Sequence, residues 1–240
     1  MGVSMGWSAG VFEGERMLGF ILTGIGEYDN KNTAYNAGTG MLPEARRRRL
    51  TLKLYQWLIR ELQEGLGIEQ FLLEVVEKNR PALRLYESLN FRVSRYLYSY
   101  QIRCKSLSRP RRREQMRVIS QLPDWTHYLP LRSFEPYWGN DFPALERGFG
   151  LRDYCLEYLD EDRKLAGFLQ GEVSTGNISL WGSPSDITVA KELFRMFAWL
   201  SPAKTLSILN VPAKSESVRR YLTDWGGKNF LNQYEMRLLL

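Results

Sequence analysis

The chain has 240 residues, 44% of them hydrophobic and 13% aromatic, which is enough to build a packed core and excludes intrinsic disorder. Its length allows one large domain or two small ones, and no apolar run is long enough to span a membrane, so we expect no membrane partner. Basic residues are concentrated in residues 104–117, which predicts a basic linker at 105–117 and makes nucleic acid a disfavoured partner.

The first predicted elements are extended. Residues 7–12 and 17–25 are expected to form strands around a turn at 13–16, and a third extended segment at 33–42 ends at Pro43. A helix follows, because leucines recur every four residues at positions 50, 54, 58 and 62.

A short apolar run at 71–76 is typical of a strand buried on both faces. Asn79 then fits the cap of a second helix, with Pro81 in its first turn, and residues 91–102 are expected to form a further strand. Helices alternate with strands only in this central part, so the expected fold class is α/β with a mixed sheet.

The second half of the sequence repeats the first. Residues 73–75 have a gapless partner at 209–211, with matching residues downstream of both, and residues 16–20 are matched by 164–168. We therefore expect two tandem domains: residues 1–104, the linker at 105–117, and residues 118–240.

Four consecutive arginines, Arg46, Arg47, Arg48 and Arg49, precede the leucine-striped helix. The first turn of a helix has free N–H groups and the positive end of the macrodipole, which favours anions and disfavours cations. A bound polyanion would offset this cost, whereas a solvated basic face is the simpler explanation. From these residues alone the two readings stay open.

Histidine and cysteine are scarce. His127 is the only histidine, and Cys104 and Cys155 match no metal or redox spacing. We therefore expect no metal site and no Ser–His–Asp centre, and isolated cysteines predict a cytoplasmic protein.

The first half resembles the GNAT superfamily of acyl-CoA N-acyltransferases over residues 10–103. Its second signature is similar to residues 73–91, through Leu73-Glu74-Val75, Asn79, Ala82, Leu85-Tyr86-Glu87 and Asn90-Phe91. Its acyl-CoA loop is similar to Pro43 through Thr51, although Arg49 and Thr51 stand where the family has small residues. In the second signature, Asn90 replaces a usual glycine. The resemblance implies tandem GNAT-like domains, with 1–104 as the acetyl-CoA-binding copy.

The resemblance also implies where acetyl-CoA would bind. The loop residues Arg46, Arg47, Arg48, Arg49, Leu50 and Thr51 would surround the pyrophosphate, with Arg46 at the family's basic position. Simple exposure to solvent is the alternative for Arg47 and Arg48. The pantetheine arm would lie between two splayed strands, bonding to the backbone of Met41 and Leu42, while Asn79 would cap its helix and present its amide group to the cofactor.

Two residues are implied to be catalytic. Tyr86 would protonate the departing thiolate, although it also fits simple packing on the buried helix face. Glu74 lies twelve residues earlier, the spacing of the base in the family branch that acetylates ribosomal-protein N-termini. Burial would raise its pKa towards neutrality, but an ion-paired structural acid remains the alternative, and many relatives use ordered water as the base.

Two departures from the family pattern are expected to matter. The first copy starts almost at its second strand, without the family's first strand and two helices. The second copy has a loop at 181–186 without a basic residue, with Asp186 or Ser185 as an ordinary helix cap, and Leu222 replaces the tyrosine. This degenerate copy is expected to contribute to an acceptor cleft or a subunit interface without binding acyl-CoA.

The function expected from the resemblance is transfer of an acetyl group from acetyl-CoA to an amine by direct attack. The acceptor is a small-molecule amine or a protein N-terminus, and a homodimer is one expected assembly. The alternatives are a non-catalytic acyl-CoA sensor or scaffold and, third, a nucleic-acid-associated protein that uses the basic linker.

Overall fold

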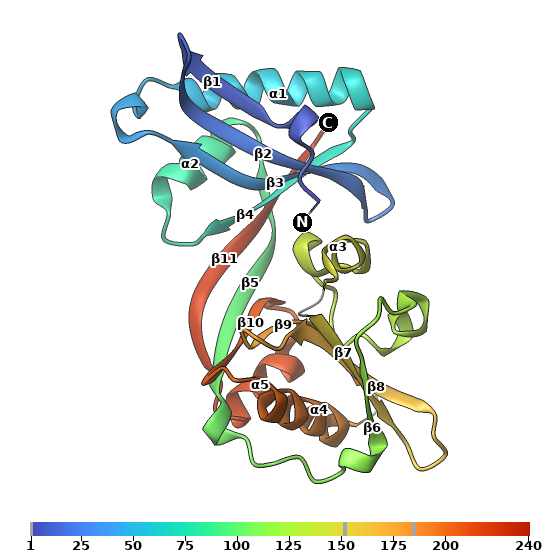
Figure 1. Cartoon of the computed structure of the whole chain (residues 1–240). Coiled ribbons are helices and arrows are strands. Elements are labelled where there is room, and N and C mark those ends of the chain that lie inside the picture. The colour runs from blue at the N-terminus through green and yellow to red at the C-terminus, as the bar shows by residue number, and fades with distance from the viewer. Residues whose placement is uncertain (1, 151–152, 184–185) are drawn as a thin grey trace. The chain divides into compact units, whose positions relative to one another are not determined.

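The computed structural model describes residues 2–150, 153–183 and 186–240 (Figure 1). The chain divides into two compact units: unit 1 comprises Met1–Tyr96 and Gln233–Leu240, and unit 2 comprises Leu97–Asn232. None of the described helices is long and apolar enough to cross a membrane.

Unit 1 begins with two antiparallel hairpins. They are built from β1 (Ala9–Glu13), β2 (Arg16–Tyr28) and β3 (Lys31–Met41), in agreement with the three predicted extended segments. The turn between β2 and β3 consists of Asp29 and Asn30, both with φ of 56°, which is the left-handed pair that a type I′ turn requires.

Two helices cover one face of the unit 1 sheet. The chain continues through α1 (Leu50–Leu66), β4 (Gln70–Val76) and α2 (Arg80–Ser88). Helix α1 buries the predicted stripe at Leu54, Leu58 and Leu62. Residues of both helices share a core with Phe71 and Leu73, so the alternate residues of β4, including Glu74, face the other side of the sheet.

Each half of the sequence contributes a strand to the sheet of the other half. Residues 233–239 of β11 (Lys228–Leu239) pair antiparallel with residues 70–76 of β4 in unit 1. Conversely, residues 97–103 of β5 (Arg92–Arg103) pair with β10 (Thr205–Pro212) in unit 2. The strand order is therefore β1-β2-β3-β4-β11-β5 in unit 1 and β11-β5-β10-β9-β8-β7-β6 in unit 2.

Unit 2 repeats the element order of unit 1, which confirms the predicted tandem repeat. The series β7-β8-β9-α4-β10-α5-β11 corresponds to β1-β2-β3-α1-β4-α2-β5. Before β7, unit 2 has β6 and several short helical segments, whereas residues 2–8 hold one short helical turn, Met5–Trp7. The remaining bounds are β6 (Met116–Ile119), α3 (Phe142–Gly148), β7 (Asp153–Leu159), β8 (Leu165–Glu172), β9 (Asn177–Gly182), α4 (Ile187–Leu200) and α5 (Glu216–Asp224).

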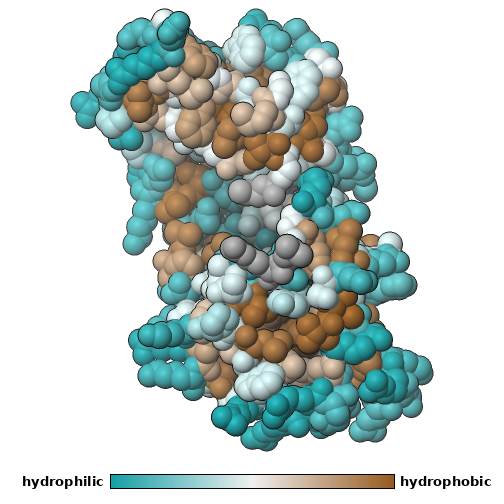
Figure 2. Space-filling view, viewed as in Figure 1, coloured by the Kyte–Doolittle hydropathy of each residue, from teal (hydrophilic) through white to brown (hydrophobic). Residues whose placement is uncertain are grey.

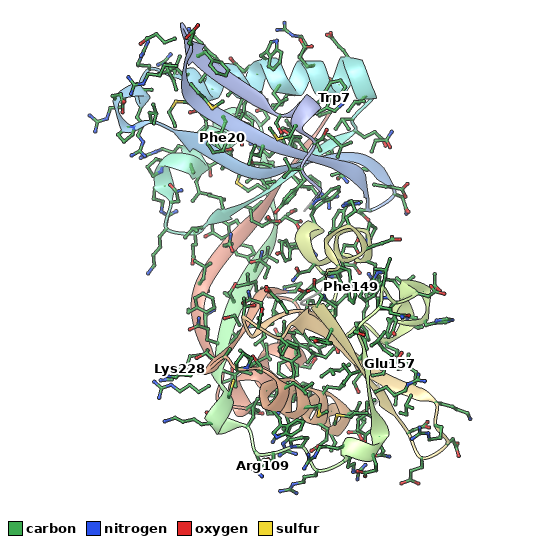
Figure 3. The ribbon with its side chains drawn as sticks, viewed as in Figure 1. Trp7, Phe20, Arg109, Phe149, Glu157 and Lys228 are labelled. Atoms are coloured by element: carbon green, nitrogen blue, oxygen red, sulfur yellow. The ribbon has the colours of Figure 1, made fainter. Side chains whose placement is uncertain are left out.

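The segment expected to be a basic linker lies within unit 2 and is held there by its arginines. The Arg111 backbone N–H donates to Glu192 Oε2 at 2.7 Å, and the Arg113 guanidinium lies 4.8 Å from the ring centroid of Trp199. Arg117 Nε donates to Glu157, which is labelled in Figure 3, at 2.8 Å. The compact units thus differ from the expected segments at both ends, because the exchanged strands pair residues more than a hundred positions apart.

Hydrophobic side chains also reach the surface of unit 1, among the polar ones visible in Figure 2. Phe12, Met17 and Phe20 of the first hairpin are exposed. The Phe20 ring, labelled in Figure 3, lies over Gly40 of β3, where a Cβ would come within 2.7 Å of it. Glycine at this position therefore makes room for a cross-strand aromatic ring.

Candidate functional site

A groove of about 770 Å³ in unit 1 lies where β3 ends and helices α1 and α2 begin. Seven of the nine residues predicted to bind acetyl-CoA line it: Met41, Arg46, Arg47, Arg49, Leu50, Thr51 and Asn79. Its lining also contains Thr39, Ala45, Leu52, Pro81, Ala82 and Leu85, but neither Leu42 nor Arg48. Tertiary structure thus brings three arginines of the run and Asn79, the predicted cap of the second helix, to one groove.

Helix α1 opens into this groove without a side-chain cap. Its N-cap residue is Arg49, which makes no capping hydrogen bond and has a φ of 57°. Helix α2, in contrast, is capped by Asn79, whose side chain accepts from the Ala82 N–H at 3.3 Å. The first-turn amides of α1 have no intrahelical partner, so they are available to an anion together with the helix dipole.

The backbone of the arginine run retains a glycine-like conformation. Arg47 and Arg49 have φ values of 63° and 57°, in the left-handed region that glycine adopts at little cost. Asn90, the other residue that replaces a usual glycine, has a φ of 68°. Arg49 and Asn90, which stand where the family has glycine, thus adopt backbone conformations that glycine reaches at little cost.

The four arginines have different surroundings. Arg46 Nε donates to the Met41 carbonyl at 3.3 Å, which holds its stem along the groove. Arg48 instead pairs with Glu13 of β1 at 3.0 Å and does not line the groove. The resemblance puts Arg46 at the family's basic position, but the pairing of Arg48 with Glu13 could not be predicted, because Glu13 is distant in the chain.

Strands β3 and β4 separate at the groove. They pair in parallel at three positions, Thr33↔Gln70, Ala34↔Phe71 and Tyr35↔Leu72. Beyond Tyr35, the pairs that the described part of the structure shows for β3 are with β2 alone. The rest of β3 therefore presents backbone groups to an open edge.

The backbone geometry favours Met41 over Leu42 as a partner for an extended ligand. The Leu42 N–H donates to Leu18 O at 2.9 Å, so that donor is already used. The same bond makes Gly19↔Met41 a non-hydrogen-bonded pair, in which the Met41 N–H and C=O point away from β2. Thr39 lies two residues earlier in β3, so its backbone N–H and C=O have the same orientation as those of Met41. The two-residue repeat of a strand could have identified Thr39 as a second backbone partner for the ligand.

Tyr86 lies in α2 and is buried, with 6% of its surface exposed. Its ring packs edge-on against Tyr55 of α1, with centroids 5.7 Å apart. Tyr55 is fully buried and shares a 2.9 Å hydrogen bond with Thr39 of the groove lining. Burial raises the pKa of Tyr55 well above its usual range, and Tyr86 adds to this effect. Tyr86 and Tyr55 thus connect the core beneath helices α1 and α2 to Thr39, at the open end of β3.

Glu74 lies on β4, two residues after the last pair with β3. Its Oε2 accepts a hydrogen bond from the Tyr35 hydroxyl, and its Oε1 is shielded from solvent without a hydrogen-bond partner among the described residues. Burial raises the pKa of Glu74 to about 8, the direction that the sequence predicted, and the nearby Glu235 carboxylate adds to it. Tyr35 and Arg95 act in the opposite direction.

The second copy has a pocket of about 520 Å³ at the start of its corresponding helix, α4. Asp186 caps α4, as predicted, by accepting from the Thr188 N–H at 2.6 Å, while Ser185 lies outside the described residues. Leu222 occupies the position of the first copy's tyrosine and is fully buried.

One basic side chain that the sequence did not indicate enters this second pocket. Arg132 comes from a helical turn about fifty residues upstream of the loop, and its guanidinium pairs with Glu135 at 3.2 Å. Over the described part of the chain, no cluster of three or more His, Cys, Asp or Glu side chains could hold a metal ion.

Comparisons with known proteins agree with this architecture. The sequence model of the "Acetyltransferase (GNAT) family" matches residues 4–91. A tandem GNAT protein from the clavulanic acid biosynthesis pathway is 13% identical, with a TM-score of 0.66 over 97% of this chain and 83% of that one. No curated protein sequence gives a significant match.

Two bacterial structures are similar in the same way. A GCN5-related N-acetyltransferase from Sphaerobacter thermophilus has a TM-score of 0.62 and 14% identity, over 93% of this chain and 77% of that one. One from Anabaena variabilis has the same TM-score and identity, over 97% and 62%. Residues 4–91 thus match the model of the GNAT acetyltransferase family, and the chain has the fold of a tandem GNAT protein. The family match supports acyl transfer as the class of reaction.

Proposed function

We propose that this protein transfers an acetyl group from acetyl-CoA to an amine. One observation carries the proposal: the uncapped start of α1, three arginines and the open edge of β3 line a single groove. An uncapped helix start surrounded by cations is costly by itself and becomes favourable when a pyrophosphate binds.

The groove residues fit the parts of acetyl-CoA. The free amides of α1, Arg46 and the Thr51 hydroxyl would hold the pyrophosphate, since charge-assisted hydrogen bonds are the strongest that these groups make. Thr39 and Met41 would bond the pantetheine amides as an added strand does. Asn79 uses its side-chain oxygen for capping, which leaves its amide N–H groups for the cofactor arm.

Glu74 and Tyr86 are proposed as the base and the acid. The amine nitrogen attacks the thioester carbonyl, so that a C–N bond forms and the C–S bond breaks. Glu74 accepts the amine proton, and Tyr86 gives a proton to the departing thiolate sulfur. Because the pKa of Glu74 is about 8, the basic form increases through neutral pH.

The remaining assignments are proposals of the same kind. The first copy is proposed to be the acetyl-CoA-binding domain, and the second is proposed to keep the fold without binding acyl-CoA, because Asp186 occupies the start of α4. Free Cys104 and Cys155 support a reducing, cytoplasmic location.

Calorimetric titration of acetyl-CoA tests the first step, and thiol release with a panel of small amines and peptide N-termini tests the second. We expect binding and turnover, with Glu74→Gln and Tyr86→Phe lowering kcat while acetyl-CoA affinity is kept. Absence of binding would refute the proposal. Binding without turnover on any amine would favour an acyl-CoA sensor.

A further inference from the structure

Two glutamates face each other directly across strands β4 and β11. Glu235 is the cross-strand partner of Glu74, and neighbouring pairs run in unbroken register from Gln233↔Val76 to Leu239↔Gln70. Directly opposed side chains in an antiparallel pair lie on the same face, with Cβ atoms about 5 Å apart. Two carboxylates at this separation cannot both ionise without cost.

Glu235 is the member of the pair that has a cation as its partner. Its side chain is fully buried, and it forms an ion pair with Arg95 of β5. Arg95 Nε donates to Glu235 Oε1 at 3.0 Å, and the Ser94 hydroxyl donates to the same oxygen at 2.7 Å. Arg95 also donates to the Tyr28 hydroxyl at 2.7 Å, which fixes the guanidinium in place.

Glu74 has the weaker set of partners. Tyr35 donates to one of its oxygens, and the other is buried without a hydrogen bond. The titratable groups that surround it come from three strands: Tyr35 from β3, Arg95 from β5 and Glu235 from β11. The guanidinium is hydrogen-bonded to Glu235, and Glu74 is left with a raised pKa.

We propose that Glu235 is a positioning residue for the first copy's site, which acts by controlling when Glu74 loses its proton. The last strand of the chain thereby supplies part of the chemistry of the first copy. This inference rests on the proposed function only for its catalytic meaning, since Glu74 is the proposed base. The coupling between the two carboxyls is a property of the folded protein and can be measured without turnover.

Carboxyl ¹³C NMR of the full chain labelled in its glutamates tests the coupling. The Glu74 signal is assigned by its loss in Glu74→Gln and titrated from about pH 4 to about pH 10. Glu235→Gln removes one charge, keeps the size of the side chain and frees Arg95, so the Glu74 midpoint should fall by about one unit or more. Glu69→Gln, an exposed carboxyl adjoining β4, is the matched control and should leave it unchanged.

Arg95→Gln should have the opposite effect, because it leaves two carboxylates without their cation and raises the Glu74 midpoint. An unchanged midpoint in a folded Glu235→Gln variant, or a shift of the same sign in both variants, would overturn the inference. If Glu235→Gln does not fold, Ser94→Ala removes one hydrogen bond to Glu235, and a Glu74 midpoint that does not rise would count against the coupling.

The pH profile of kcat/KM separates this inference from the proposed function. If Glu74 is the base, the rising limb of the profile moves with the NMR midpoint in Glu235→Gln. A moved midpoint with an unmoved profile supports the coupling and contradicts the assignment of Glu74 as the base. Loss of activity without any change in midpoint or limb would show a structural role only, which also overturns the inference.

Discussion

Arg46→Ala removes one guanidinium from the groove and leaves the core untouched, because Arg46 is exposed and its side chain donates to the Met41 carbonyl at 3.3 Å. Two unit charges about 4 Å apart interact by about 1 kcal/mol in water and about 4 kcal/mol at an effective dielectric constant of 20. An open groove lies nearer the first limit, so we expect a loss of about 1–2 kcal/mol, or about five- to thirty-fold in the Kd for acetyl-CoA.

Isothermal titration calorimetry at two salt concentrations is the assay, and Arg48→Ala is the matched control. Arg48 belongs to the same run and is equally charged, but it pairs with Glu13 and does not line the groove. We expect its Kd to change by about twofold or less. If both substitutions weaken acetyl-CoA binding equally, the arginines act through their overall positive charge and not through a direct phosphate contact by Arg46. Unchanged acetyl-CoA affinity in Arg46→Ala would refute the phosphate assignment.

Three further outcomes are expected. Arg49→Gly should raise the free energy of unfolding by about 0.5–1 kcal/mol, because an arginine at φ 57° is strained, and thermal unfolding that shows a lower Tm would contradict this. Tyr55→Phe removes the 2.9 Å hydrogen bond to Thr39 and should cost about 1 kcal/mol in urea unfolding, with a lower kcat because Tyr86 loses a polar neighbour. Since the pKa of Glu74 rises from 4.5 to about 8 on folding, the folded state binds the extra proton, and stability should fall as pH rises between these values. Glu74→Gln should flatten that slope, and an unchanged slope would show that another group titrates.

Local structure could be predicted well from the sequence where one signal was sufficient. The leucine stripe located α1, and Asn79 with Pro81 located the start of α2. These features depend on residues within a few positions of each other, so periodicity and capping chemistry are enough. The turn at Asp29-Asn30 was not predicted, although two such residues in succession are a recognised hairpin signal.

The candidate site was only partly predictable. The arginine run and Asn79 follow a local motif, and the structure brings most of them to one groove. Leu42 differs from Met41 only in which neighbour its backbone faces, and this depends on the pairing with β2. Tyr55 carried no signal beyond helix amphipathicity.

The sequence by itself determined the element order of the first half, the tandem repeat and the place of the arginine run before α1, because each follows from short motifs at fixed spacing. Only the tertiary structure decided which arginines enter the groove and where the chain divides. It alone placed Glu235 of β11 opposite Glu74, 161 positions away in the chain. Strand exchange between two similar copies is a matter of long-range register, and both copies present similar strand patterns. Which strand completes which sheet is therefore settled by burial and hydrogen bonding in the folded chain.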